Sequence, residues 1–264
     1  MSAFAEKYGP FAVVAGASEG LGAAFAHAIA ARGVGVVLIA RRAEALRAVA
    51  DEVARDHHVE ARTLACDLAD ASFTDALAEA TRGLEIGLGV YNAAYSFIAP
   101  LLERPLDDAL RVVDVNVRGP LRFARALLPA MVERKRGGLI LLASMAGFQG
   151  GPRLATYAAS KAFNIVLAES LWAELAPSGV DVLAACPGAV RTPGYLKTTE
   201  TEAPGTLDPL DVASRTLDAL GSGPTYVPGA VNKLARFFLG RLLPRSTAVG
   251  IMQRNTQALA DAKG

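Results

Sequence analysis

The sequence predicts an α/β protein built on a doubly wound parallel sheet of about seven strands, and three observations carry this prediction. Short apolar runs alternate with longer segments of helical periodicity along the chain, which is the pattern of repeated βαβ units. Hydrophobic residues make up 52% of the chain and the mean hydropathy is +0.30, as expected for strands buried on both faces. A glycine-rich turn separates the first apolar run from the first helical segment.

The expected strands are short apolar runs bounded by turn residues. They cover residues 11–15, 35–40, 60–65, 88–92, 138–143, 180–186 and 224–227. The segments between them carry alanine, leucine and charged residues at helical spacing. They predict helices over 21–32, 43–57, 72–82, 106–135, 154–176 and 209–220. Helix-stopping residues support these ends, with Gly33 after the first helix, Gly137 and Gly138 after the long one, and Gly179 after the fifth.

No stretch has the composition of a linker, so residues 1–264 are expected to form a single domain. Residues 193–206 have a loop-like composition and follow the carboxyl end of a strand, where open α/β sheets bind ligands, so they are expected to form a substrate loop. Residues 229–264 lie beyond the last predicted strand and are expected to form a helical extension.

That extension contains an amphipathic basic helix over residues 230–243. Its apolar positions are Val231, Leu234, Ala235, Phe238 and Leu242, and its cations are Lys233, Arg236 and Arg241. A helix of this kind has four alternative roles: it can dock on its own domain, cover a substrate pocket, join a subunit interface or make a peripheral contact with a membrane surface. The sequence leaves these alternatives open.

Charge and composition exclude several classes of protein. The net charge is +1 with both signs interspersed, which argues against a nucleic-acid partner. No apolar run approaches the roughly 18 residues needed to cross a membrane, and the first residues lack the pattern of a signal peptide, so a cytoplasmic location is expected. Cys66 and Cys186 each close an apolar run without metal-ligand spacing, and are expected to be inert buried thiols rather than part of a metal site.

The turn Gly16-Ala17-Ser18-Glu19-Gly20-Leu21-Gly22 lies between an apolar strand and a helix. Glycines let the main chain approach a pyrophosphate, whose charge is stabilised at the amino end of a helix. Three glycines alone are weak evidence. The next strand, however, ends at Arg41 and Arg42, where an NAD site usually has an acidic residue for the ribose 2′-hydroxyl. Because a guanidinium can bind a 2′-phosphate, NADP is favoured over NAD.

The same turn also fits the G-x-S-x-G nucleophile elbow of α/β-hydrolases, with Ser18 as the nucleophile. That fold needs an acid and then a histidine later in the chain. The histidines here are His27, His57 and His58, all within the first two predicted helices. The hydrolase interpretation is therefore disfavoured.

Tyr157 and Lys161 are one helical turn apart and follow Ser144, which comes directly after a predicted strand. A phenol has a pKa of about 10 and exchanges protons poorly near neutrality unless a cation lowers this value. Residues at i and i+4 share one face of a helix, so Lys161 can provide that cation. The pair is typical of an acid–base site.

As a set, these motifs resemble the classical short-chain dehydrogenase/reductase family, which implies a three-layer Rossmann fold and an NADP-preferring carbonyl reductase. The resemblance covers residues from about 10 to 228 and includes Asp67-Leu68, Asn92-Ala93, Asn116, Ser144, Tyr157, Lys161, Pro187-Gly188 and Thr192. It implies that Tyr157 is the general acid or base, Ser144 holds the substrate oxygen, and Asn116 supports a water chain to Lys161. It places Asp67 near adenine and Thr192 near the nicotinamide carboxamide.

The expected cofactor-binding residues are Gly16, Ser18, Glu19, Gly20, Leu21, Gly22, Arg41, Arg42, Asp67, Leu68, Asn92, Ala93, Tyr157, Lys161, Pro187, Gly188, Val190 and Thr192. Two departures from the family pattern affect fine cofactor geometry. Ala15 replaces a threonine, and Tyr91-Asn92-Ala93-Ala94 replaces Asn-Asn-Ala-Gly.

The substrate half is less informative. Candidate pocket residues follow strand ends and are Tyr95, Ser96, Phe97, Phe148, Gln149 and Tyr195. Their mixed character favours an apolar carbonyl compound with one or two polar groups, and hydroxysteroid, ketoacyl and aromatic ketone substrates all stay open. Other functions on this scaffold are an epimerase or dehydratase, or a non-catalytic NADP-sensing or scaffold protein. The resemblance also implies a homodimer or homotetramer paired through the helices over 106–135 and 154–176.

Overall fold

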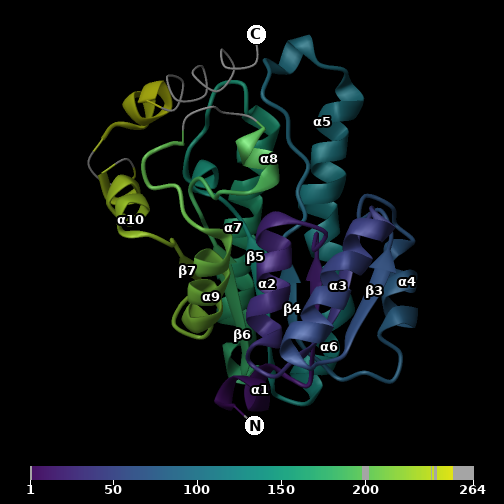
Figure 1. Ribbon diagram of the computed structural model, residues 1–264. Helices are drawn as coiled ribbons and strands as arrows, with labels where there is room; N and C mark the ends of the chain where they lie inside the picture. The colour runs from purple at the N-terminus through teal and green to yellow at the C-terminus, as the bar shows by residue number, and fades with distance from the viewer. Residues whose placement is uncertain (1, 198–201, 239, 241–242, 252–264) are drawn as a thin grey trace.

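A seven-stranded parallel sheet forms the centre of the molecule (Figure 1). The computed structural model describes residues 2–197, 202–238, 240 and 243–251. Its strands are β1 (Phe11–Ala15), β2 (Gly35–Ala40), β3 (Ala61–Ala65), β4 (Ile86–Tyr91), β5 (Gly137–Leu142), β6 (Val180–Ala185) and β7 (Thr225–Tyr226). The order in the sheet is β3-β2-β1-β4-β5-β6-β7, and every neighbouring pair is parallel. The predicted doubly wound sheet is confirmed.

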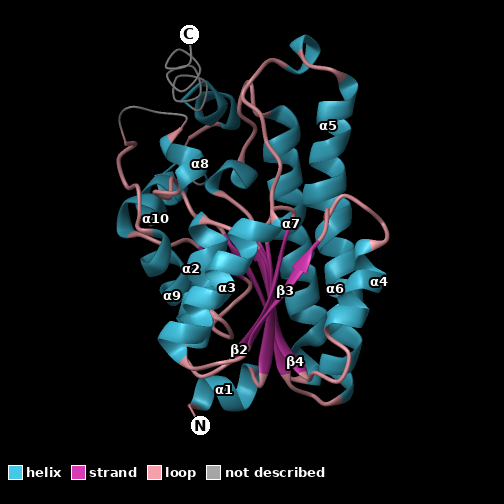
Figure 2. Cartoon of the chain, turned by 45° about the vertical axis from the view of Figure 1, so that its right-hand side comes forward, coloured by secondary structure: helices cyan, strands magenta, loops and turns pink. Residues whose placement is uncertain are grey.

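Helices cover both faces of the sheet and make three layers (Figure 2). One face packs against α2 (Gly20–Ala30), α3 (Ala43–His57) and α9 (Pro209–Ala219). The other packs against α4 (Phe73–Ala80), α6 (Gly119–Glu133) and α7 (Ala155–Leu175). Other α-helices are α1 (Ala3–Tyr8), α5 (Leu106–Val113), α8 (Pro193–Leu196) and α10 (Ala230–Phe237), and residues 245–251 are also helical.

Sequence periodicity explains how these layers fit together. Every residue of β2, β4 and β5 is buried, because both faces of these central strands are covered by helices. In α3 the buried residues are Leu46, Val49, Ala50 and Val53, which follow the i, i+3, i+4, i+7 spacing of one helix face. The edge strand β3 is only partly buried. None of the helices in the described ranges combines the length and apolarity needed to cross a membrane.

The structure differs from the predicted elements in three places. Helix α1 was not predicted; it is a short helix capped by Ser2, whose hydroxyl accepts a hydrogen bond of 3.1 Å from the amide of Ala5. The helix predicted over 106–135 is interrupted by a π turn, η2 (Asp114–Arg118), between α5 and α6. The loop predicted over 193–206 begins with α8, and its residues 198–201 lie outside the described ranges.

A buried tyrosine supports the π turn. The hydroxyl of Tyr91, at the end of β4, donates a hydrogen bond of 2.6 Å to the carbonyl of Val115 inside η2. Burial raises the pKa of the Tyr91 phenol, so the hydroxyl keeps its proton and acts as a donor. Gly119 leaves room for this hydroxyl, because a Cβ at position 119 would overlap it. Tyr91 is one of the departures from the family pattern, and here it fixes the turn that carries Asn116.

We expect Tyr91→Phe to lower the free energy of unfolding by about 1–3 kcal/mol, because the carbonyl of Val115 would remain buried without its donor. Denaturant unfolding measures the change. Tyr226→Phe is the matched control, since the hydroxyl of Tyr226 makes no hydrogen bond within the described residues. Equal stability of the two variants would contradict this role of Tyr91.

Candidate active site

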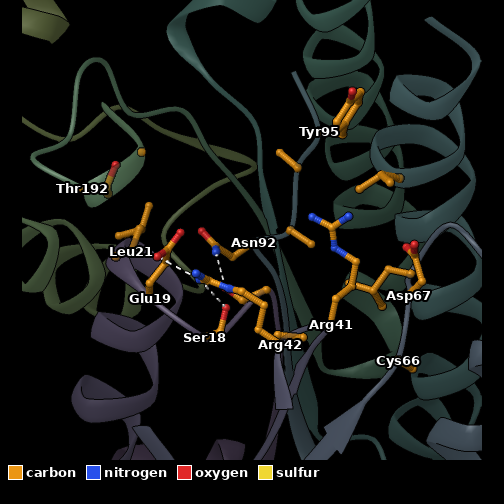
Figure 3. Close-up of a pocket in the computed structure, with 18 of the residues that line it drawn as sticks. Ser18, Glu19, Leu21, Arg41, Arg42, Cys66, Asp67, Asn92, Tyr95 and Thr192 are labelled. Atoms are coloured by element: carbon orange, nitrogen blue, oxygen red, sulfur yellow. Dashed lines mark hydrogen bonds and ion pairs between the residues drawn. The ribbon is translucent and has the colours of Figure 1, made fainter. Parts of the chain in front are cut away.

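A cavity of about 570 Å³ opens at the carboxyl ends of β1 to β4 (Figure 3). This is the point at which the strand order reverses, where open α/β sheets form ligand crevices. The predicted cofactor residues that line it are Gly16, Ser18, Glu19, Gly20, Leu21, Arg41, Arg42, Asp67, Leu68, Asn92, Ala93 and Thr192. The structure adds Ala40, Cys66, Ala94, Tyr95, Arg111, Val115 and Gly194.

The glycine turn is packed against the end of β4. Gly16 has a φ of +83°, and a Cβ there would lie 2.7 Å from the backbone nitrogen of Ala93. A Cβ on Gly22 would overlap the carbonyl oxygen of Gly16, which accepts a hydrogen bond of 2.9 Å from the Asn92 side chain. Both glycines are therefore required by close approach, which leaves bare backbone at the amino end of α2.

The two arginines after β2 have different surroundings. Arg42 donates a hydrogen bond of 3.1 Å to the Ser18 hydroxyl and lies 2.8 Å from a carboxylate oxygen of Glu19, so it closes over the glycine turn. Arg41 also lines the cavity (Figure 3), and among the described residues no hydrogen bond or ion pair reaches its side chain. Its guanidinium is available to an anionic ligand.

Arg111 is a cavity residue that the sequence did not identify. It donates a hydrogen bond of 2.6 Å to Asp67, and this pair holds the pKa of Arg111 above its usual value. The Arg111 guanidinium also lies 5.6 Å from the centre of the Tyr95 ring. Although burial opposes it, the pKa of Asp67 is lowered by the Ala69 amide and by Arg111. Nothing in the sequence distinguishes Arg111 from an ordinary exposed arginine on an amphipathic helix.

Asn116 joins three segments around the site. Its side-chain oxygen accepts a hydrogen bond of 2.8 Å from the amide of Tyr95, and its side-chain nitrogen donates to the Tyr95 carbonyl at 3.0 Å. The same nitrogen donates to the Ser160 hydroxyl at 3.0 Å, and Ser160 in turn donates to the carbonyl of Tyr157 at 2.7 Å. Both amide hydrogens are used, so the Asn116 side chain serves as a bracket between α7 and the loop after β4.

Ser144, Tyr157 and Lys161 come together where β5 ends beside α7. Tyr157 is half-buried and its side chain is hydrogen-bonded with Ser144. The Lys161 ammonium lies 5.6 Å from the centre of the Tyr157 ring and donates a hydrogen bond of 2.7 Å to the carbonyl of Leu142. The sequence therefore identified three side chains that share one site.

Burial dominates the proton affinities in this group. It lowers the pKa of Lys161 to about 8. It also raises the pKa of Tyr157, and the hydrogen bond with Ser144 opposes that rise only in part. The pKa of Tyr157 therefore lies above its usual value rather than below it as expected, because loss of hydration outweighs the hydrogen bond with Ser144.

Some expected residues lie away from the cavity. Gly22, Pro187, Gly188, Val190, Tyr157 and Lys161 do not line it. Gly22 packs behind the turn, and Gly188 approaches the side chain of Asn232 in α10. Thr192 lies close to Gly20, which places the start of the 193–206 loop against the glycine turn.

The expected substrate residues divide into two groups. Tyr95 lines the cavity itself. The others lie elsewhere: Phe97 lies under the guanidinium of Arg104, Phe148 under that of Arg236, and Gln149 is buried. The Tyr195 hydroxyl accepts a hydrogen bond of 2.8 Å from the amide of Ala203, so it fixes the fold of the loop.

The cysteines are poor nucleophiles in these surroundings. Burial raises the pKa of Cys186 to about 12 and that of the half-buried Cys66 to about 11. Cys66 packs against the core and also lines the cavity, which the sequence did not predict. In the described residues, no group of three or more His, Cys, Asp or Glu side chains could hold a metal ion.

Comparison with known proteins gives a consistent result. The family model described as short chain dehydrogenase matches residues 10–203. The chain is 32% identical over 233 residues to a 7β-hydroxysteroid dehydrogenase of Clostridium sardiniense, covering 87% of this chain and 89% of that one. A solved structure from a study of 7β-hydroxysteroid dehydrogenase stereoselectivity superposes with a TM-score of 0.89 at 27% identity, covering 94% and 98% of the two chains.

A second group of relatives is longer. The chain is 37% identical over 184 residues to a very-long-chain 3-oxoacyl-CoA reductase of Coprinopsis cinerea, which covers 68% of this chain but 54% of that protein. The similarity to this relative therefore concerns about half of its length.

We expect Gly22→Ala to destabilise the fold by about 1–3 kcal/mol and to weaken the binding of a nicotinamide dinucleotide, because the added methyl group would displace the backbone of Gly16. Thermal unfolding and ligand titration measure the two effects. Gly150→Ala is the control, since a Cβ there meets nothing within 4 Å. If Gly22→Ala matched this control in both assays, the close approach would not matter.

Proposed function

The chain belongs to the short-chain dehydrogenase/reductase family, and from this premise we propose that it reduces an apolar ketone with NADPH, with Tyr157 as the proton donor. Members of this family are oxidoreductases that act on hydroxyl and keto groups with nicotinamide cofactors. The observation that carries the proposal is the grouping of Ser144, Tyr157 and Lys161 at the end of β5, beside the cavity at the strand reversal.

Each side chain has a part that follows from its position. The Ser144 hydroxyl donates a hydrogen bond to the carbonyl oxygen of the substrate, and Tyr157 gives its phenolic proton to the same oxygen as charge develops there. Lys161 stabilises the phenolate that remains, since its ammonium lies within 5.6 Å of the ring centre. When bound, NADPH supplies the hydride.

The protonation states favour reduction. Because burial raises the pKa of Tyr157, the phenol is neutral near pH 7 and is ready to donate a proton. Lys161, with a pKa of about 8, is mostly charged at the same pH. Alcohol oxidation would need the phenolate in the ground state, which burial disfavours.

The residues present fit a phosphorylated dinucleotide. The bare backbone at Gly16 and Gly22 leaves room for a pyrophosphate at the amino end of α2. Arg41 would bind the 2′-phosphate, because its side chain lines the cavity and makes no hydrogen bond or ion pair in the described part of the chain. Arg42 would assist from its place over Ser18.

Two substrate classes are suggested by the relatives' names, a hydroxysteroid and a long-chain 3-oxoacyl thioester. Both carry a large apolar part with a ketone or hydroxyl group. Of the expected substrate residues, Tyr95 lines the cavity, and its ring suits the apolar part of such a substrate. A non-catalytic NADP sensor is less well supported, because Asn116, Ser144, Tyr157 and Lys161 are all retained. An epimerase or dehydratase would keep Tyr157 and Lys161 but usually has a longer substrate-binding region.

We also propose that the protein forms a homodimer in which α5, α6 and α7 make the contact between the two subunits. These helices expose large apolar side chains that a single chain leaves uncovered, namely Leu106, Leu110, Val113, Leu121, Val166 and Trp172. A second copy would bury such a surface by a twofold contact.

We expect Tyr157→Phe to lower kcat for ketone reduction by a factor of about 10²–10⁴, because the proton donor is removed while the ring is kept. NADPH binding, followed by its fluorescence, should change little. Tyr226→Phe provides the control for loss of a hydroxyl on the same chain. Turnover close to that of the unaltered protein would reject Tyr157 as the acid.

The pH profile tests Lys161. Below its pKa of about 8 the ammonium is charged, so kcat/KM for NADPH, which reports the free enzyme, should be constant there and fall as pH rises above this value. Stopped or continuous assays at the nicotinamide absorbance measure it. A profile that stays flat through the alkaline range would argue against a buried ammonium with this pKa.

Arg41→Asp should lower the ratio of kcat/KM for NADPH over NADH by about tenfold or more, because a charge-assisted bond to the 2′-phosphate is lost and a repulsive charge replaces it. The control is Arg55→Asp on α3, an exposed arginine away from the cavity. An unchanged ratio would remove Arg41 from the NADP site without affecting the assignment of Tyr157.

A further inference from the structure

Helix α10 is attached to the domain by its polar side chains. Asn232 is buried and donates hydrogen bonds to the carbonyls of Gly205 at 3.3 Å and Pro228 at 3.1 Å. The guanidinium carbon of Arg236 lies 3.2 Å from the centre of the Phe148 ring, and the ammonium of Lys233 lies 5.4 Å from the centre of the Tyr226 ring. These contacts hold α10 beside the segment that follows Ser144.

The apolar side chains of α10 and of the residue after it face solvent. The exposed fraction is 55% for Val231, 59% for Leu234, 48% for Phe237 and 47% for Phe238, and the two phenylalanine rings lie edge to face with centres 5.8 Å apart. A helix that packs on its own domain buries this side and exposes the polar one. Of the alternatives that the sequence left open, docking of α10 on its own domain through Val231, Leu234 and Phe238 is not what the structure shows, and Leu242 lies outside the described residues.

The sequence around α10 has one sign of charge. Between Asp218 and Asp261 there is no acidic residue, whereas Lys233, Arg236, Arg241, Arg245 and Arg254 are cationic. Because the whole chain has a net charge of only +1, the remainder is net acidic. Positive charge is thus concentrated in the segment that also exposes an apolar face.

We propose that α10 docks the protein on an anionic lipid surface. Val231, Leu234, Phe237 and Phe238 enter the boundary between headgroups and acyl chains, and the net positive charge of the segment adds a long-range attraction to the lipid phosphates. The polar contacts of Asn232 and Arg236 leave this face outward, so docking needs no rearrangement of the helix. The contact with Phe148 brings the edge of the catalytic segment near the same surface.

A second copy of this chain is a poorer occupant of the same face. A twofold contact would place each cation of the segment near its own counterpart, with no acidic residue from 219 to 260 to compensate. An anionic bilayer has the complementary charge.

Vesicle sedimentation of the full chain tests the proposal without any assay of activity, so it is independent of the proposed reaction. The probes are phosphatidylcholine vesicles and vesicles that also contain phosphatidylglycerol. We expect binding to the anionic vesicles that weakens with salt. Phe237→Ser/Phe238→Ser should lower this binding at least about tenfold, since moving even one phenylalanine ring out of water contributes a factor of that order.

Leu234→Ser and Leu210→Ser form a matched pair, because Leu210 on α9 is 52% exposed but lies outside the α10 face. Only the first should weaken vesicle binding, and neither should change the unfolding temperature. The proposal is overturned if the unaltered protein ignores anionic vesicles or if both leucine variants bind alike. It is also overturned if Phe237→Ser/Phe238→Ser lowers the unfolding temperature or the oligomeric state, since the face would then pack against protein.

Discussion

The side chain of Asn116 holds together the three segments on which the candidate active site depends. It pairs with both backbone groups of Tyr95 and with the hydroxyl of Ser160, so the π turn, the loop after β4 and helix α7 cannot shift independently. A fully paired amide in a buried position is stable, whereas a partly paired one is costly. The position of Tyr157 relative to the cavity thus follows from one residue that need not touch a substrate.

The π turn is itself maintained from a neighbouring strand. Tyr91 reaches from β4 to the carbonyl of Val115, and Gly119 makes room for its hydroxyl. The strand that ends beside the glycine turn therefore also sets the helix that carries Asn116 and Arg111. Strand β4 thus contacts both the glycine turn and the π turn that carries Asn116. The tyrosine at position 91, which departs from the family pattern, is therefore compatible with an intact site.

Burial shifts the pKa values of the candidate catalytic residues more than their hydrogen bonds and charged neighbours do. Lys161 and Tyr157 both lose hydration, which favours the neutral form of each and places the phenol on the donor side of the reaction. Around the nucleotide cavity the opposite holds, because Arg42 and Arg111 have carboxylate partners and Arg41 remains available. Helix α10 adds a third environment, in which Lys233 and Arg236 lie over the rings of Tyr226 and Phe148.

The sequence by itself determined the doubly wound sheet, because apolar runs and helical periodicity are local properties that survive without knowledge of contacts. The sequence also predicted that Ser144, Tyr157 and Lys161 lie close together, and it predicted most of the residues that line the cavity around Gly16. Both predictions follow because the strand ends of a parallel sheet meet at one edge. Three features became apparent only in the tertiary structure. They are the π turn between α5 and α6, the position of Arg111 in the cavity, and the exposure of the apolar face of α10. Each depends on partners distant in sequence: Tyr91 for the turn, Asp67 for Arg111, and Phe148 with Gly205 for α10. The tertiary structure also reversed the expected effect on the Tyr157 pKa, because burial is a property of the whole fold rather than of residues four apart on a helix.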